Sequence, residues 1–169
     1  MAAIAVIGLL GSTAAYLLLN AMDDYMEATM AAQLHAELSI GLDRIVREVR
    51  RIELDPEIAG AVPHIIDYTA TSLDWEEGPT GSMVTYSVSL VATDLLLEAD
   101  GFTGPILTDA ILFTVRAFNE DNTYLAPPLT LAACAPIRRV EFTVSISRSG
   151  LTETLRAKIY LRAMMAGAG

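Results

Sequence analysis

Cysteine is nearly absent from this 169-residue chain, because Cys134 is the only one. A single cysteine excludes an intrachain disulfide, a CxxC redox pair and a metal site built from several thiolates. We therefore interpret Cys134 as a small packed or loop residue rather than a nucleophile. The length fits one compact domain with an appendage and is short for two independent cores.

Basic residues are scarce as well. The chain has 11 Lys and Arg residues against 21 Asp and Glu residues, which gives a net charge of −10. The field around such a protein repels phosphate backbones and anionic lipid headgroups. The sequence also offers no aromatic-basic groove of the kind that binds single-stranded nucleic acid. No nucleic-acid partner is therefore expected.

Histidine is limited to His35 and His64, and neither belongs to a recognisable catalytic motif. A hydrolase needs a nucleophile, a base and an orienting group in one site. Asp94, Asp100 and Asp109 carry the oxygen ligands that calcium prefers, but their spacing matches no known ligand loop. The sequence therefore predicts no catalytic residue, no metal site and no cofactor, and we expect a protein that is not an enzyme.

Charge is missing altogether from residues 1–22, and no Lys or Arg precedes Arg44. About 20 apolar residues in a helix span roughly 30 Å, the thickness of the hydrocarbon core of a bilayer. A cleaved secretory signal has a basic start and a shorter apolar stretch, so we interpret residues 1–22 as a membrane-spanning helix. Because no basic anchor precedes it, we expect that a charged leader was removed or lies outside the numbering.

Small residues lie along this apolar stretch, namely Gly8, Gly11, Ser12, Ala14 and Ala15. Small side chains let helix backbones approach closely in lipid or in a bundle. The stretch therefore favours packing between helices. A lone membrane anchor that merely tolerates these residues is the alternative.

Proline is absent before Pro56, so nothing interrupts a helix over the first part of the chain. We predict one helix over residues 1–53, ended by the turn signal Asp55-Pro56. Residues 1–22 are its apolar half and residues 23–53 its amphipathic half. In the second half apolar residues recur in steps of three or four, the spacing of one helical face: Leu34, Leu38, Leu42, Ile45, Val49 and Ile52.

After Pro56 the period of the pattern changes from that of a helix to that of a strand. Apolar and polar residues alternate strictly over residues 84–90, which predicts a strand with one buried face. Residues 110–118 are rich in β-branched and aromatic side chains and end at the turn-forming residues 119–122, which predicts a second strand.

A β-hairpin is predicted near the C-terminus, where alternation over 140–146 and over 155–161 flanks the turn Arg148-Ser149-Gly150. Shorter strands are expected around residues 65–69, 95–98 and 124–125. Residues 76–82 and 125–136 are rich in Gly, Pro and small residues and are expected to be loops, and residues 163–169 a frayed tail.

Residues 54–169 are therefore predicted to form a head built on an antiparallel sheet. An isolated sheet cannot bury its own face, and the apolar stripe of the helix is the only long amphipathic surface able to cover it. We expect an α+β fold in which helix 1–53 docks on head 54–169 through Leu34, Leu38, Leu42, Ile45, Val49 and Ile52.

Three stretches follow the long apolar helix in an order typical of one family. They are 38–50 (LSIGLDRIVREVR), 107–118 (LTDAILFTVRAF) and the pair 137–146 with 157–162. Each is a pattern of a helix or a strand rather than a chemical motif. Together they resemble the type IV pilin and type II secretion pseudopilin superfamily, and within it the J/W-type branch of minor pilins and pseudopilins.

The resemblance implies a structural subunit of a type IV pilus-like or pseudopilus filament, whose partners are copies of itself or other pilins and pseudopilins. Before assembly the subunit would be held in the inner membrane, and after assembly the filament would be extracellular or periplasmic. The resemblance places filament packing and anchoring on Met1, Ile4, Ala5, Val6, Ile7, Gly8, Leu9, Leu10, Gly11, Leu17, Leu18 and Leu19.

The chain departs from the family pattern at three positions. Family members usually begin the mature chain with phenylalanine and carry glutamate at the fifth position, where this chain has Met1 and Ala5. That glutamate is thought to pair with the N-terminal amine of a neighbouring subunit, and Ala5 has no such group. The helix-kinking proline of the family is also missing, with Met22 in its region, which favours a continuous helix.

Two other functions are compatible with an apolar N-terminal helix. A single-span, membrane-anchored extracytoplasmic binding or receptor domain that does not polymerise is the alternative to a filament subunit. A tethered enzyme is disfavoured because the chain contains no recognisable catalytic motif.

Overall fold

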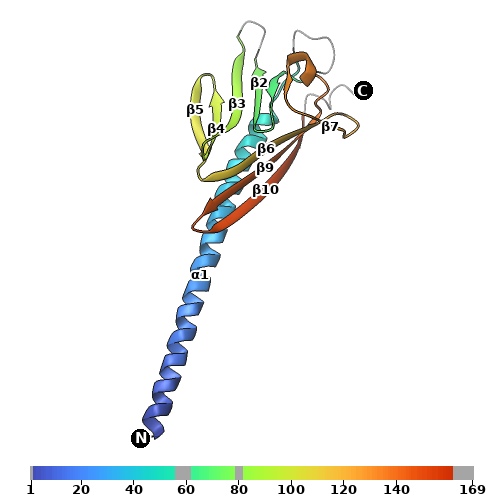
Figure 1. Cartoon of the computed structure of the whole chain (residues 1–169). Coiled ribbons are helices and arrows are strands. Elements are labelled where there is room, and N and C mark those ends of the chain that lie inside the picture. Colours follow the sequence, from blue (N-terminus) through green and yellow to red (C-terminus); the bar gives the residue numbers. More distant parts are fainter. Residues whose placement is uncertain (1, 56–61, 79–81, 162–169) are drawn as a thin grey trace. The chain divides into compact units, whose positions relative to one another are not determined.

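The computed structural model describes residues 2–55, 62–78 and 82–161, with side chains from Thr13 onward. The fold is α+β, with one N-terminal helix and antiparallel sheets, as predicted. Helix α1 covers Ala2–Val49 without a break (Figure 1), which agrees with the absence of proline from this part of the chain. The chain divides into two compact units, residues 1–36 and residues 37–169, so α1 contributes residues to both.

Helix α1 ends at Val49 rather than at the predicted residue 53. The amide of Arg51 donates to the carbonyl oxygen of Glu48 at 2.9 Å. This is an i to i−3 bond, which commonly closes the last turn of a helix and satisfies a carbonyl that has no helical partner. Ile52 therefore lies beyond the helix, although its side chain is buried.

The strands of the 37–169 unit form two antiparallel sheets, which corrects the prediction of a single sheet (Figure 1). The larger sheet has the order β5-β4-β3-β2-β1-β8 and the smaller the order β10-β9-β6-β7. The larger sheet contains β1 (Ile65–Tyr68), β2 (Ser72–Glu77), β3 (Val84–Val91), β4 (Asp94–Ala99), β5 (Phe102–Leu107) and β8 (Leu129–Thr130). The smaller sheet contains β6 (Ala110–Phe118), β7 (Tyr124–Leu125), β9 (Arg139–Arg148) and β10 (Leu151–Tyr160).

The hairpin predicted near the C-terminus is confirmed by β9 and β10, which pair from Arg148↔Leu151 to Arg139↔Tyr160. Ser149 and Gly150 connect them and both have positive φ, 54° and 83°. Two such residues form the type I′ turn, whose twist matches that of the strands beside it. The predicted strands at 65–69, 84–90, 95–98, 110–118 and 124–125 are likewise confirmed, as β1, β3, β4, β6 and β7.

The loop predictions were partly wrong. Glu76 and Glu77 belong to β2 rather than to a loop, and β5 has no counterpart in the prediction. The stretch 125–136 contains β8 and the short 3₁₀ helix η1 (Leu131–Cys134). The predicted tail at 163–169 lies outside the described residues.

Tyr68 connects the two sheets. Its ring is buried, and its hydroxyl accepts a hydrogen bond from the amide of Ala117 at 3.2 Å. The hydroxyl proton is directed to the carbonyl oxygens of Val115 and Leu125, at 3.4 and 3.3 Å. Because Tyr68 lies on β1 and its partners lie on β6 and β7, these bonds hold the larger sheet against the smaller one.

Two stacked aromatic pairs fill the core of the 37–169 unit. Trp75 stacks on Tyr86 across β2 and β3, with ring centres 5.5 Å apart. Phe113 stacks on Phe142 across β6 and β9, with ring centres 5.8 Å apart. Such pairs add about 0.5–1.5 kcal/mol each to the burial of the rings. Each sheet therefore has one face committed to the core.

Candidate functional site

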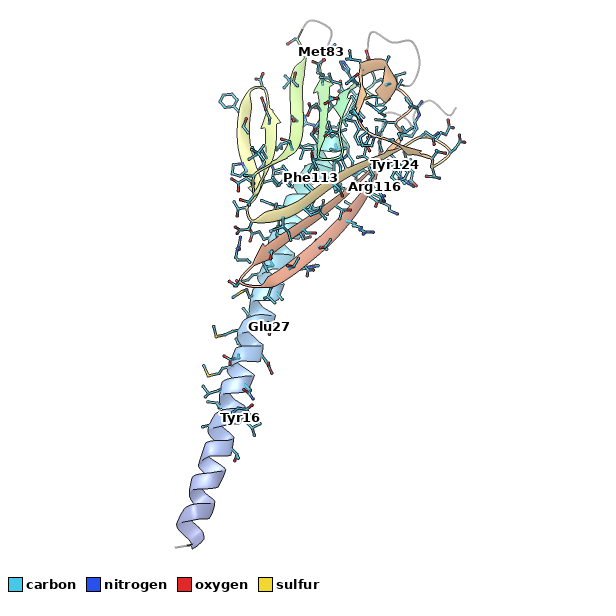
Figure 2. All side chains as sticks on the ribbon, viewed as in Figure 1. Tyr16, Glu27, Met83, Phe113, Arg116 and Tyr124 are labelled. Carbon is cyan, nitrogen blue, oxygen red and sulfur yellow. The ribbon has the colours of Figure 1, made fainter. Side chains whose placement is uncertain are left out.

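The described side chains of the first part of α1 lie in solvent. Every side chain in residues 13–29 is exposed, and Tyr16 and Glu27 are seen projecting from the helix in Figure 2. Soluble monomers rarely expose contiguous apolar patches, and such patches mark interaction sites. The large apolar side chains in this stretch are 55–73% exposed: Tyr16, Leu17, Leu18, Leu19, Met22, Tyr25 and Met26.

Leu17, Leu18 and Leu19, which were predicted to pack in a filament core or a membrane, lie in this exposed stretch. Consecutive helical residues are about 100° apart, so the three leucines project on different sides of α1. No helix in the described part of the chain is long and apolar enough to cross a membrane. The side chains of the other predicted packing residues lie outside the described ones: Met1, Ile4, Ala5, Val6, Ile7, Gly8, Leu9, Leu10 and Gly11.

The apolar stripe of α1 is buried along its whole length. Ile40, which lies off this stripe, is 72% exposed, so burial follows one face of the helix. The six stripe residues are each at most 6% exposed: Leu34, Leu38, Leu42, Ile45, Val49 and Ile52.

Gly41 lies on the buried side of α1 and permits a close approach of the larger sheet. A Cβ atom at this position would lie 2.5–2.8 Å from the side-chain carbons of Leu107, at the end of β5. Carbon atoms in contact are normally about 3.5–4.0 Å apart. Leu107 therefore packs directly on the helix backbone, in space that any larger residue at position 41 would occupy. The sequence prediction did not single out Gly41, although a glycine inside a helix is a signal of close packing.

Arg148 joins the helix to two strand ends of the 37–169 unit. Its Nη1 atom lies 3.0 Å from Oε2 of Glu37 on α1. Its Nη2 and Nε atoms lie 2.8 and 2.9 Å from Oδ2 of Asp109, which precedes β6. The hydrogen bonds to Glu37 and then to Asp109 raise the pKa of Arg148 above its ordinary value. The guanidinium thus bridges two carboxylates, an arrangement for which its planar fork is suited.

Glu77, the last residue of β2, is a buried carboxylate near the C-terminal end of α1. Its Oε1 atom accepts a hydrogen bond from Nε1 of Trp75 at 3.2 Å, and its Oε2 atom lies 3.6 Å from Nη2 of Arg51. Burial raises the pKa of Glu77, against the opposing effects of the Trp75 hydrogen bond and the Arg51 charge. The ion pair between Glu77 and Arg51 connects β2 to the turn that ends α1.

Cys134 and His64, the residues considered as reactive groups, lie among packed neighbours. Burial, with the nearby charge of Asp67, raises the pKa of Cys134 to about 11, so the thiol is protonated at neutral pH and a poor nucleophile. Nε2 of His64 lies 3.2 Å from Oε2 of Glu76. Among the described residues, no three His, Cys, Asp or Glu side chains converge in a way that could hold a metal ion.

Comparison with models of known protein families gives no match, and comparison with curated proteins gives no relative of significant similarity.

Proposed function

We propose that this chain is a structural subunit of a type IV pilus-like or type II secretion pseudopilus filament, which polymerises through its N-terminal helix. The observation that carries the proposal is the exposed apolar surface of α1 over residues 13–26. Burying apolar surface is favourable by about 25 cal/mol per Å², so a helix that exposes large apolar side chains on several sides is stabilised by neighbours that cover them. Neighbouring copies of the same helix would provide that surrounding.

The division of α1 into two functional parts supports the proposal. Over residues 37–49 one face of the helix is buried within the head unit, and Leu107 packs on Gly41. Over residues 13–29 every side chain is exposed. A helix with these two parts can both hold a head domain and assemble with its copies.

In this proposal the inner membrane holds the subunit through residues 1–22 before assembly, and the filament then lies outside the cytoplasm. The function is the assembly itself, so no catalytic residue or cofactor takes part. The partners are further copies of this chain or related pilins.

The experiment combines electron cryo-microscopy of filaments sheared from cells that make the chain with two matched variants. Leu18→Glu places an acid on the exposed helix, and Phe102→Glu places the same acid on the head, where Phe102 is 82% exposed. We expect filaments built from the wild type and from Phe102→Glu, and none from Leu18→Glu, because a carboxylate is costly in a packed apolar core.

Equal filament yields from the two variants would mean that the helix is not the packing element. A wild-type chain found in no filament and recovered as a membrane monomer would favour the single-span receptor instead. Emission of the buried Trp75 checks that each variant keeps a folded head, since this is the only tryptophan.

A further inference from the structure

The charges of this chain are separated along the sequence. The 64 residues between Arg51 and Arg116 contain 11 Asp and Glu residues and no Lys or Arg. From Arg116 to the C-terminus there are 7 Lys and Arg residues and only 4 Asp and Glu residues. The first segment contains β1 to β5 of the larger sheet. The second contains the end of β6 with β7, β9 and β10 of the smaller sheet, and β8 is its only strand in the larger sheet. The separation in sequence therefore becomes largely a separation between sheets.

The outer face of the smaller sheet is basic. Strand alternation places Arg116, Glu141 and Lys158 side by side on β6, β9 and β10, opposite the face that carries the buried phenylalanines. Arg156 and Arg139 flank this row on the same face. Together the four cations and one carboxylate form what we call the basic face. Nζ of Lys158 lies 3.5 Å from Oε2 of Glu141, and Glu141 is buried beneath its neighbours.

Aromatic rings hold two of the cations on the basic face in place. The guanidinium carbon of Arg139 lies 4.2 Å from the ring centre of Phe118 and 5.8 Å from that of Tyr160. The guanidinium carbon of Arg116 lies 5.5 Å from the ring centre of Tyr124, and the two are labelled side by side in Figure 2. The smaller sheet therefore carries an aromatic-basic surface that the sequence prediction did not find.

The outer face of the larger sheet is acidic. Leu73, Trp75, Leu95 and Leu97 are buried on its inner face, so alternation places the acids between them on the outer face. Cross-strand pairing aligns Asp74 and Glu98 on either side of Ser87, whose hydroxyl donates to Oδ1 of Asp74 at 2.6 Å. What we call the acidic face carries five carboxylates and, over its described strands, no Lys or Arg: Asp67, Asp74, Glu76, Asp94 and Glu98.

We propose that the basic face of one copy of this chain binds the acidic face of the next copy. This inference rests on the proposed function, which makes a second copy of the chain the partner. Charge complementarity then decides which two faces meet. Contacts between like faces are opposed by repulsion, so the favoured contact joins two different surfaces. Such a head-to-tail contact either closes into a ring or continues as an open filament, which has one free face of each kind at its ends.

A long polyanion is the less favoured occupant of the basic face. The whole chain carries a net charge of −10, and the acidic face of the same unit would repel a phosphate backbone. The guanidinium of Arg139 lies 4.2 Å from the ring centre of Phe118, so one face of that ring is not free to stack on a base.

Three full-length variants test the contact in detergent solution, where the apolar helices are covered. The basic-face variant is Arg156→Glu with Lys158→Gln, and the acidic-face variant is Glu98→Lys with Asp94→Asn. The control, Arg44→Glu with Arg47→Gln, makes the same change in charge as the basic-face variant at exposed positions of α1. Sedimentation velocity at low salt measures self-association.

We expect each face variant alone to associate at least about tenfold more weakly than the wild type, and the control to associate as the wild type does. In an equimolar mixture, the acidic-face variant contributes an intact basic face and the basic-face variant contributes an intact acidic face. The mixture is therefore expected to form heterodimers but no longer species. Because the contact is ionic, wild-type association should also fall as salt rises and the Debye length shortens to about 3 Å at 1 M.

A mixture that fails to pair would overturn the proposal, as would a control that weakens association as much as the face variants. Tight binding of a thymidylate oligonucleotide that only the basic-face variant loses, with self-association unchanged, would assign the basic face to nucleic acid instead. Sheared filaments that tolerate both face variants would overturn this contact and leave the proposed function intact. Heterodimers formed by a chain that never enters a filament would support the contact while the proposed function failed.

Discussion

Gly41→Ala is expected to destabilise the 37–169 unit, although alanine is the better helix former. In a helix interior alanine is favoured over glycine by about 1 kcal/mol. The added methyl would lie 2.5 Å from Cγ of Leu107, a branch atom of a buried side chain. Forcing an extra carbon into a filled core costs about 1–3 kcal/mol. The net change in the free energy of unfolding is therefore a loss of up to about 2 kcal/mol.

Removing Leu107 should reverse the sign of this effect. Leu107→Ala alone opens a cavity and is expected to cost about 2–5 kcal/mol. In that background the methyl group of Gly41→Ala enters space that Leu107 has left, so the second change should restore about 1 kcal/mol. The two substitutions are thus coupled by about 1–3 kcal/mol, the range found for residues in contact.

Urea unfolding in mild detergent, followed by the emission of Trp75, measures the free energy of unfolding. It is applied to the full-length wild type, to Gly41→Ala, to Leu107→Ala and to the double variant. Gly104→Ala is the matched control, because a Cβ atom on Gly104 meets nothing within 4 Å. The control should change stability little. The reasoning is refuted if Gly41→Ala changes stability by the same amount with Leu107 intact as with Leu107→Ala, since Leu107 would then move aside without cost.

Three further outcomes follow from buried groups. Because burial raises the pKa of Glu77 above 4.5, the folded chain holds this proton more tightly than the unfolded chain does. The wild type should therefore lose stability relative to Glu77→Gln as pH rises above 4.5, and urea midpoints on both sides of that value measure the difference. Iodoacetamide should modify Cys134, whose pKa is raised to about 11, far more slowly in the native chain than in urea, as mass spectrometry would report. Tyr68→Phe should cost about 1–3 kcal/mol in the same urea assay, because the Ala117 amide loses its buried acceptor.

The helical part of the fold follows from the sequence because its signals are local. The absence of proline predicted an unbroken helix, and the steps between Leu34 and Val49 predicted which face is buried. The end of the helix was harder to place, since Ile52 continues the apolar spacing after the backbone has left the helix. The apolar spacing therefore extended the predicted helix past its final turn.

Strand β5 was missed because it contains Gly104 and Pro105, which weaken a strand signal. Both are tolerated because β5 is an edge strand, where proline need not donate to a neighbour. The pair Asp100-Gly101 between β4 and β5 is a strong hairpin signal, and both residues have positive φ, 52° and 75°. This turn was the one local feature that pointed to the strand.

The contacts of Arg148 with Glu37 and Asp109 could not be read from the sequence, because they join residues that are distant along the chain. The same is true of the basic face, whose members come from β6, β9 and β10 and meet only through strand pairing. Charge separation along the chain was visible in the residues. Its conversion into two oppositely charged faces required the division of the head into two sheets.

The buried polar residues of β9 bear on the proposed contact of the basic face. Alternation predicted one exposed face for this strand, yet Glu141, Thr143 and Ser145 are buried. Side chains of β10 contact two of them: Nζ of Lys158 lies 3.5 Å from Oε2 of Glu141, and the hydroxyl of Thr154 lies 2.7 Å from that of Ser145. Cations that are already held against neighbours lose less conformational entropy when a partner arrives. Arg116 and Arg139, which lie against aromatic rings, therefore present their charges in a more fixed position than a flexible cluster of lysines would.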